Sequence, residues 1–450
     1  MFCSRRSIRA ASLALIVSLM PHNALAQQSP PGSLEGVLDR LDALEKQNQE
    51  LLTEIRALRE QLKNGQAQTS PPAPALEDRV DVAEQRIKEH AETKVSASQK
   101  FPLSITGMFL FDSYIANGTD NPAFLTNYGD YSLGAPGGGA TLRQSILGLD
   151  FQGPHIFADG RINGSLSMDF FNRSGSDDVL RIRRGTVSFD WSRRSIVFGQ
   201  DKPIISPLQP SSFARVGIPP LSGAGNLWLW LPQVTYVERV PFSSATRATI
   251  QTSLIQTDET YSVLSSTDSE YVAPSRPAIE ARFELQHTWK SESKITVGIG
   301  GHASTSHILG QSIPSRVISA DLAYKPLRWL ELSSTLLHGE NFANLGGIPP
   351  GVTVVGQSVT PIHGTAGWLQ LAFPITNRLT VDIYAGRQQN QARDLSSYEI
   401  SRTLIYAGNV LYRCAPNVVL GFEASPDRLQ YLNKTAIASN RYDATVAYLF

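Results

Sequence analysis

The chain has 450 residues, 40 Lys and Arg against 40 Asp and Glu, and 41% hydrophobic residues. The zero formal charge argues against a nucleic-acid-binding protein, which typically carries a basic excess. After residue 26 no segment reaches the roughly 18 consecutive apolar residues of a membrane-spanning helix, which excludes a helical membrane transporter.

Residues 1–26 have the pattern of a secretory signal peptide. An apolar core follows three basic residues, and the segment ends in the small-residue motif Ala24-Leu25-Ala26. We expect cleavage before Gln27, which removes Cys3 and leaves Cys414 as the only cysteine of the mature chain. Since such a chain forms no intrachain disulfide, its stability must come from size, assembly or a membrane.

Residues 27–100 are predicted to form a coiled coil and a linker. The heptad positions a and d are Leu34, Val37, Leu41, Leu44, Asn48, Leu51, Ile55, Leu58 and Leu62, and all but Asn48 are apolar. A solvated helix on a globular surface is the alternative, but it would leave eight apolar side chains in water. The heptads therefore predict self-association, although Asn48 by itself does not separate a dimer from a trimer.

Residues 101–450 change to a period of two. In the segment 278–290, Ile279, Phe283 and Trp289 alternate with charged residues such as Arg282, so that one face of a strand is apolar and the other is charged. Strands of about ten residues with this alternation are typical of outer-membrane β-barrels. The predicted strands are 103–115, 141–152, 156–171, 179–191, 194–200, 232–240, 245–256, 278–290, 293–304, 315–325, 328–340, 362–374, 377–390, 399–413, 416–424 and 439–450.

These sixteen segments predict an all-β fold, a 16-stranded antiparallel transmembrane barrel that follows the α-helical coiled coil. Long connections at 116–140, 201–231, 257–277 and 341–361 alternate with short ones, as expected when one rim faces the periplasm and the other the exterior. The predicted short turns are Gly153-Pro154, Ser192-Arg193, Ser291-Glu292-Ser293, Lys325-Pro326-Leu327, Pro374-Ile375-Thr376 and Ala415-Pro416. A change of phase near Arg184-Gly185 predicts a β-bulge there.

The last strand alternates Tyr442, Ala444, Val446, Tyr448 and Phe450. With this alternating last strand and its terminal Phe, the chain resembles outer-membrane porins, in which the barrel-assembly machinery recognises the C-terminal Phe. The resemblance implies that Tyr448 and Phe450 form the insertion signal. The resemblance narrows to the DcaP-like trimeric porins. It rests on the order of the leader, the heptads, the barrel and several short motifs: Arg143-Gln144-Ser145, Met168-Asp169-Phe170-Phe171, Arg181-Ile182-Arg183, Gly199-Gln200, Pro232-Gln233 and Tyr406-Ala407-Gly408-Asn409.

This resemblance implies a homotrimer in the lipid of the outer membrane, with the coiled coil in the periplasm. It also implies a passive channel for small anionic solutes such as dicarboxylates, with no cofactor. Sixteen strands enclose a water-filled lumen, so polar side chains on the inner face cost little.

The connection 201–231 is predicted to fold back into the lumen as a constriction. Its five prolines give it a fixed shape, and it has too many apolar residues for a loop in solvent. Trp228 and Trp230 suit packing at the barrel wall or an interfacial girdle. The predicted pore-lining residues are Arg143, Asp169, Arg181, Arg183, Lys202, Arg215, Glu280, Arg282 and Glu284. Their cations either create a positive eyelet or pair with Asp169, Glu280 and Glu284.

Two other functions compete with a channel. The coiled coil would be the working part of an adhesin or structural tether, whereas a barrel hydrolase would need a local Ser, His and Asn set that the sequence does not single out. We predict no catalytic residues and no metal site, because His302 and His307 are five residues apart on or beside a strand and point to opposite faces.

Overall fold

The computed structural model describes residues 103–117, 137–171, 180–261, 263–264, 272–274, 276–289, 293–434 and 436–450, together with Lys46, Glu50, Thr53 and Glu54. The chain divides into two units, Met1–Ala97 and Ser98–Phe450. In the first unit the four described residues are helical and exposed. The signal peptide and all nine predicted heptad positions lie outside the described residues, so both stay predictions.

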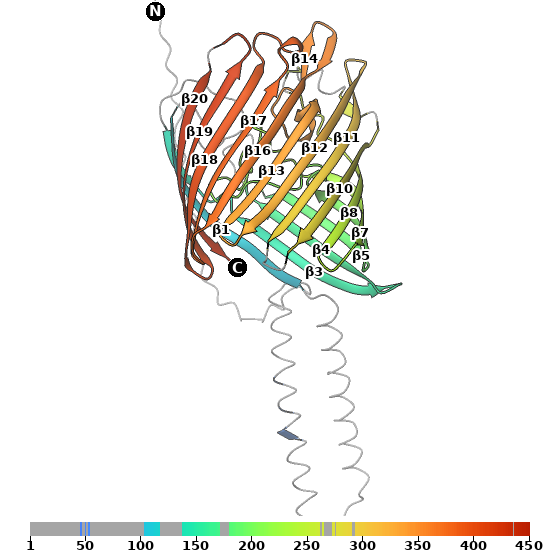
Figure 1. Cartoon of the computed structure of the whole chain (residues 1–450), viewed down its shortest axis with the longest axis vertical. Helices are drawn as coiled ribbons and strands as arrows, with labels where there is room; N and C mark the ends of the chain where they lie inside the picture. The colour runs from blue at the N-terminus through green and yellow to red at the C-terminus, as the bar shows by residue number, and fades with distance from the viewer. Residues whose placement is uncertain are drawn as a thin grey trace, which may run out of the picture. The chain divides into compact units, whose positions relative to one another are not determined.

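The second unit is a β-barrel (Figure 1). Its strands are β1 (Leu103–Asn117), β2 (Gly137–Thr141), β3 (Ile146–Ile156), β4 (Gly160–Asp169), β5 (Arg181–Asp190), β6 (Arg194–Asp201), β7 (Leu231–Pro241), β8 (Thr246–Ile255), β9 (Ala273–Pro274), β10 (Ala278–Thr288), β11 (Lys294–Ile308), β12 (Gln311–Leu327), β13 (Leu330–Glu340), β14 (Val352–Val355), β15 (Ser358–Pro361), β16 (His363–Pro374), β17 (Leu379–Asn390), β18 (Ile400–Ala415), β19 (Val418–Tyr431) and β20 (Ile437–Leu449). Two short 3-10 helices are η1 (Phe342–Leu345) and η2 (Ala392–Asp394).

The barrel closes because β1 pairs with strands from both ends of the chain. Met108 lies opposite Leu449 on β20, and Leu103 lies opposite Phe151 on β3. β2 also pairs with β1 and continues the line of β3, while β9 pairs with β11 and continues the line of β10. Apart from the separate β14–β15 ribbon, the wall therefore has sixteen antiparallel strands, which confirms the predicted barrel.

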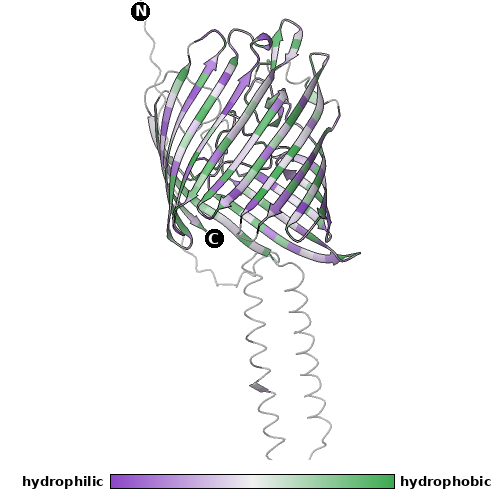
Figure 2. Ribbon diagram, viewed as in Figure 1, coloured by the Kyte–Doolittle hydropathy of each residue, from purple (hydrophilic) through white to green (hydrophobic). Residues whose placement is uncertain are grey.

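The alternation of residues becomes an apolar outer face and a polar inner face. On β10, Ile279 and Phe283 are 59% and 43% exposed, whereas Glu280 and Arg282 between them are 0% and 4% exposed. In Figure 2 hydrophobic positions, in green, and hydrophilic positions, in purple, are interspersed along the strands of the wall. Among the described residues no helix is long and apolar enough to cross a membrane.

The last strand has the predicted pattern. Tyr442, Val446 and Tyr448 are about half exposed on the outer face. Phe450 completes the pairing with β1, because its backbone exchanges two hydrogen bonds with Gly107, of 2.9 and 3.1 Å. A side chain at Gly107 would meet the Phe450 ring at 2.7 Å, so the glycine makes room for the terminal aromatic residue.

Two predicted turns are wrong. Gly153-Pro154 lies within β3, where the register shifts between Gln152 and His155, and the chain turns only after Ile156. Likewise Lys325-Pro326-Leu327 belongs to β12, with a register shift before Leu327. In both places a bulge leaves the proline outside the regular ladder, where its missing N–H costs nothing. The turns at 191–193, 375–378 and 416–417 agree with prediction, and the turn at 291–293 lies partly outside the described residues.

Candidate functional site

The connection from β6 to β7, residues 202–230, folds inside the barrel, and we call it the lumen loop. Its side chains Ile205, Leu227 and Trp228 are at most 1% exposed. They belong to one apolar cluster with wall residues of β8, β12, β13 and β16, among them Ile255 and Val317. The apolar residues of the loop are therefore buried against the inner face of the wall, as their number predicted.

Glycines allow the lumen loop to approach the wall closely. Gly225 has φ +103°, and a Cβ there would stand 2.4 Å from the carbonyl oxygen of Gly367 on β16. A Cβ on Gly386 of β17 would likewise meet the carbonyl oxygen of Ala224 at 2.2 Å. Backbone thus packs on backbone at this point, which only residues without side chains permit.

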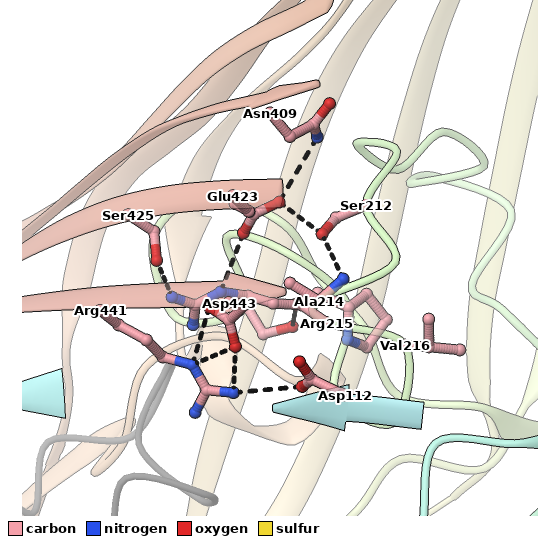
Figure 3. A network of polar contacts seen from close by, with 12 residues as sticks. Asp112, Ser212, Ala214, Arg215, Val216, Asn409, Glu423, Ser425, Arg441 and Asp443 are labelled. Atoms are coloured by element: carbon pink, nitrogen blue, oxygen red, sulfur yellow. Dashed lines mark hydrogen bonds and ion pairs between the residues drawn. The ribbon is translucent and has the colours of Figure 1, made fainter. Parts of the chain in front are cut away.

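The middle of the lumen loop is held to the wall at β18 and β19 by buried polar contacts (Figure 3). Arg215 Nε lies 3.3 Å from Glu423 Oε1 on β19, and Arg215 Nη2 donates to the Ser425 hydroxyl. Ser212 Oγ donates to Glu423 Oε2 at 2.5 Å, and Asn409 Nδ2 on β18 donates to the same oxygen at 3.4 Å. Arg215 and Glu423 are 3% and 2% exposed, so the ion pair is shielded from water.

A second group of contacts ties the same segment to β1 and to the residues before β3. Gln144 donates to Asp112 on β1 and to the carbonyl of Ala214, each at 3.2 Å, and accepts from the N–H of Gly217 at 2.9 Å. Asp112 in turn faces Arg441 of β20 at 3.5 Å. We call the two groups together the loop-anchoring network; it consists of Asp112, Gln144, Ser212, Arg215, Asn409, Glu423, Ser425, Arg441 and Asp443.

The first turn of the lumen loop is anchored separately. Glu280 on β10 accepts a hydrogen bond from the backbone N–H of Ile204 at 2.8 Å, and its other oxygen lies 2.9 Å from His302 Nδ1. Neither Glu280 nor the His302 side chain is exposed. Glu280 therefore positions the loop.

The predicted bulge in β5 occurs at Arg183. Ser167 of β4 lies opposite Arg184, and the next residue, Met168, lies opposite Ile182, so Arg183 is the extra residue. A bulge interrupts the alternation of faces, and the register then turns Arg181, Arg183 and Arg184 all to the lumen. The bulge thereby places Arg181, Arg183 and Arg184 on the inner face within four consecutive residues.

The three arginines have different surroundings. Arg181 makes a bidentate pair with Asp169, at 2.9 and 2.6 Å, and also donates to the carbonyl of Gly217 in the lumen loop at 2.6 Å. Arg183 is 3.7 Å from the same carboxylate and lies over the Trp230 ring, 4.7 Å from its centroid. One carboxylate thus serves two guanidinium groups, which leaves a positive excess.

A cavity of about 490 Å³ lies between this cluster and the start of the lumen loop. It is lined by Arg183, Arg184 and Lys202, with Asp201, which pairs with Arg184 at 3.0 Å, as the acidic residue of its lining. Arg183 Nη1 and Lys202 Nζ are buried and have no hydrogen-bond partner among the described residues. Burial lowers the pKa of Lys202 to about 7, and the charge of Arg183 contributes to the lowering. The excess of positive charge beside this cavity suits an anionic ligand.

The other predicted pore residues are distributed around the wall. Arg282 is 4% exposed and is held by Asp321 at 2.7 Å and Glu284 at 2.8 Å. Arg215 and Glu280 take part in loop anchoring, whereas Arg143 is half-buried beside the anchoring residue Gln144. The structure brings Arg183 and Lys202 together and keeps Arg215 and Arg282 out of the lining of this cavity.

Sequence reasoning missed Arg184, which lines the cavity. The signal was present, since a bulge next to two consecutive arginines turns both to one face. Trp228 and Trp230 lie inside the barrel, not in an interfacial girdle; their rings meet edge to face at 5.8 Å. In the part of the chain that the structure describes, no group of His, Cys, Asp and Glu is arranged to hold a metal ion.

Comparisons with known proteins place the fold. No protein-family model matches the chain, and no curated protein matches its sequence. The outer-membrane channel DcaP of Acinetobacter baumannii matches in structure with a TM-score of 0.65 and 18% identity, over 78% of this chain and 98% of that one. An anion-selective porin from Comamonas acidovorans matches with a TM-score of 0.53 and 13% identity, over 78% of this chain and all of that one. The chain therefore has the fold of outer-membrane porins, as its resemblance to the DcaP-like trimeric porins predicted.

Proposed function

We propose that the protein is an outer-membrane porin, a passive diffusion channel for small polar solutes with a preference for organic anions such as dicarboxylates. The barrel supplies the wall and the lumen loop narrows its interior. The proposal depends above all on the excess of positive charge beside one cavity of the lumen, where Arg183 Nη1 and Lys202 Nζ have no hydrogen-bond partner among the residues that the structure describes.

The preference for anions follows from the charges around that cavity. Three cations face it with one carboxylate, Asp201, whereas Asp169 is already shared between Arg181 and Arg183. A carboxylate solute in the cavity would lie beside these positive charges, and Arg184, whose side chain is 51% exposed, is able to donate hydrogen bonds to it directly. The alternative is that acidic residues neutralise all of these cations. It holds for Arg181 and Arg282, which are paired with carboxylates at short distances, but it does not account for Arg183 and Lys202.

The test is the reversal potential of the protein in planar bilayers across a salt gradient. The double variant Arg183→Gln/Lys202→Gln should shift the reversal potential toward the value of a cation-selective pore. Arg194→Gln is the matched control, because Arg194 pairs with Glu238 on the outer face of the wall. An unaltered potential in the double variant would place the filter elsewhere, and a wild-type protein without current would end the porin proposal.

Liposome swelling in a panel of organic acids, amines and sugars would identify the solute class. Faster entry of the acids supports the proposed preference, whereas equal rates indicate a general pore. The same experiment separates a channel from a barrel hydrolase, which would release products without solute flux.

The assembly is proposed from the resemblance. We propose a homotrimer with the coiled coil of residues 27–100 in the periplasm, inserted by the barrel-assembly machinery through Tyr448 and Phe450. A structural tether or adhesin with the coiled coil as its working part is the second candidate. The anchored lumen loop favours the channel, because a tether needs no shaped interior.

A further inference from the structure

The outer face of β17, β18 and β19 carries charge of one sign. The acidic residues of these strands are Asp382, Glu423 and Asp427, and all three are 2–3% exposed, on the lumen side. Three arginines, Arg387, Arg402 and Arg428, are exposed at positions that alternate with these inward residues. We call Arg387, Arg402 and Arg428 the outer arginine cluster.

The strand register brings the three arginines close together. Leu404 of β18 lies opposite Arg387 on one side and Arg428 on the other, so their Cα atoms are about two strand spacings, or 10 Å, apart. Arg402 is two residues from Leu404 on the same face, and its diagonal neighbours are about 7–8 Å away. Three guanidinium groups can therefore converge on one anion.

The cluster lies at the end of the barrel opposite the short turns. Arg387 is three residues before the end of β17, and Arg402 is two residues after the start of β18. β17, β18 and β19 lie side by side in Figure 1, and purple positions occur toward their upper ends in Figure 2. An outward arginine costs about 2–4 kcal/mol at the membrane midplane but only about 0–1 kcal/mol near the interface. The position is therefore at headgroup depth.

Neutral side chains orient two of the three arginines. Arg387 donates to Gln389 at 2.7 Å, and Arg402 donates to Gln430 at 2.6 Å. Within the described part of the chain no carboxylate lies within ion-pair distance of the three arginines. The outer arginine cluster thus presents donors whose charge is not neutralised by the protein.

A shallow apolar groove lies beside Arg387 on the outer wall. It has a volume of about 640 Å³ and is lined by Leu336, Leu369, Ala385 and Leu404, and Arg387 is the member of the outer arginine cluster in its lining. The groove also includes Gly367, where a Cβ would meet Leu336 Cδ2 at 2.7 Å. An apolar groove that adjoins a cluster of arginines has the polarity of a lipid molecule.

We propose that the outer arginine cluster and the groove beside it bind a phosphorylated lipid of the outer leaflet, with the phosphate on the arginines and an acyl chain in the groove. Arginine suits this ligand because its planar fork makes paired, charge-assisted hydrogen bonds to phosphate oxygens. Basic clusters at headgroup depth are a general means of selecting anionic lipids.

The test is native mass spectrometry of the full, detergent-solubilised protein, titrated with bis-phosphorylated lipid A and, separately, with phosphatidylcholine. The wild type should retain lipid A and not phosphatidylcholine. The triple variant Arg387→Gln/Arg402→Gln/Arg428→Gln should bind lipid A at least about tenfold more weakly, the size of one charge-assisted hydrogen bond. Heat-modified gel mobility reports whether the variant barrel is folded.

The control removes the same charge at the opposite rim, in Arg328→Gln/Arg378→Gln/Arg413→Gln, whose three arginines are exposed. This variant should keep wild-type affinity for lipid A. If both triple variants lose the same affinity for lipid A, the lipid is held by general charge attraction. If Arg387→Gln/Arg402→Gln/Arg428→Gln keeps its affinity, the arginine cluster is not the binding site. Either result overturns the proposal. A changed oligomeric state with unchanged lipid binding would instead assign the face to a second copy. Lipid binding and channel function can be tested separately, because the protein should conduct ions in phosphatidylcholine bilayers whichever of these lipid-binding results is obtained.

Discussion

Removing Arg215 should release the middle of the lumen loop. Arg215 Nε is 3.3 Å from Glu423 Oε1, and both side chains are 2% exposed. Burial lowers the pKa of Arg215, but Asp427, Glu423 and Asp443 raise it and their effect is larger, so the guanidinium is always charged. Arg215→Met would therefore leave a buried carboxylate without its cation.

The size of the effect follows from the remaining contacts. Breaking a buried ion pair by deleting one partner costs about 3–5 kcal/mol. Since Ser212 and Asn409 still donate to Glu423, we expect the lower end, about 3 kcal/mol. That is a factor of about 100 in the equilibrium between attached and detached loop. The double variant Arg215→Met/Glu423→Gln should recover part of this loss, because residue 423 then carries no unpaired charge.

The assay combines single-channel conductance with thermal unfolding of the purified barrel. The single variant should show larger and noisier currents and a lower unfolding temperature, and the double variant should return toward wild type. Arg194→Met is the control, since its pair with Glu238 has side chains 65% and 23% exposed and contributes at most about 1 kcal/mol. Currents and unfolding temperature unchanged from wild type in Arg215→Met would refute the anchoring role.

Three further outcomes are expected. Burial and Arg183 lower the pKa of Lys202 to about 7, so its positive charge is lost as the pH rises through that value. The anion preference measured from reversal potentials should therefore fall between about pH 6 and about pH 8. The variant Lys202→Met should abolish this pH dependence. Gly225→Ala should lower the unfolding temperature more than Gly310→Ala, which has a similar positive φ but open space around it; equal effects would show that φ alone matters. Deleting residues 34–95 should leave barrels that insert but whose oligomer melts at lower temperature in detergent, whereas unchanged melting would make the coiled coil a tether.

The sequence predicted the wall better than its turns. Alternation decides which face of a strand is apolar, so the sixteen strands and the bulge near Arg184 could be read directly. Prolines misplaced two turns, because Pro154 and Pro326 sit in bulged strands and a bulge removes the usual conflict between proline and a ladder.

The site could be predicted only in part. Lys202 and Arg183 were both candidates, and they do line one cavity. The anchoring role of Arg215 had no local signal, because its partner Glu423 is 208 residues away in the chain. The same holds for the outer arginine cluster, whose members come from three strands and share a face only through the register.

The sequence by itself determined that residues 101–450 form an alternating strand wall, because a pleated strand assigns each side chain to one face through its nearest neighbours alone. It also determined that the connection after β6 is too apolar for solvent. Only the tertiary structure decided which charges meet across the lumen and which are left unpaired. Closing the barrel and folding the loop inside it set those distances, and ionic contacts depend on distance in space instead of along the chain.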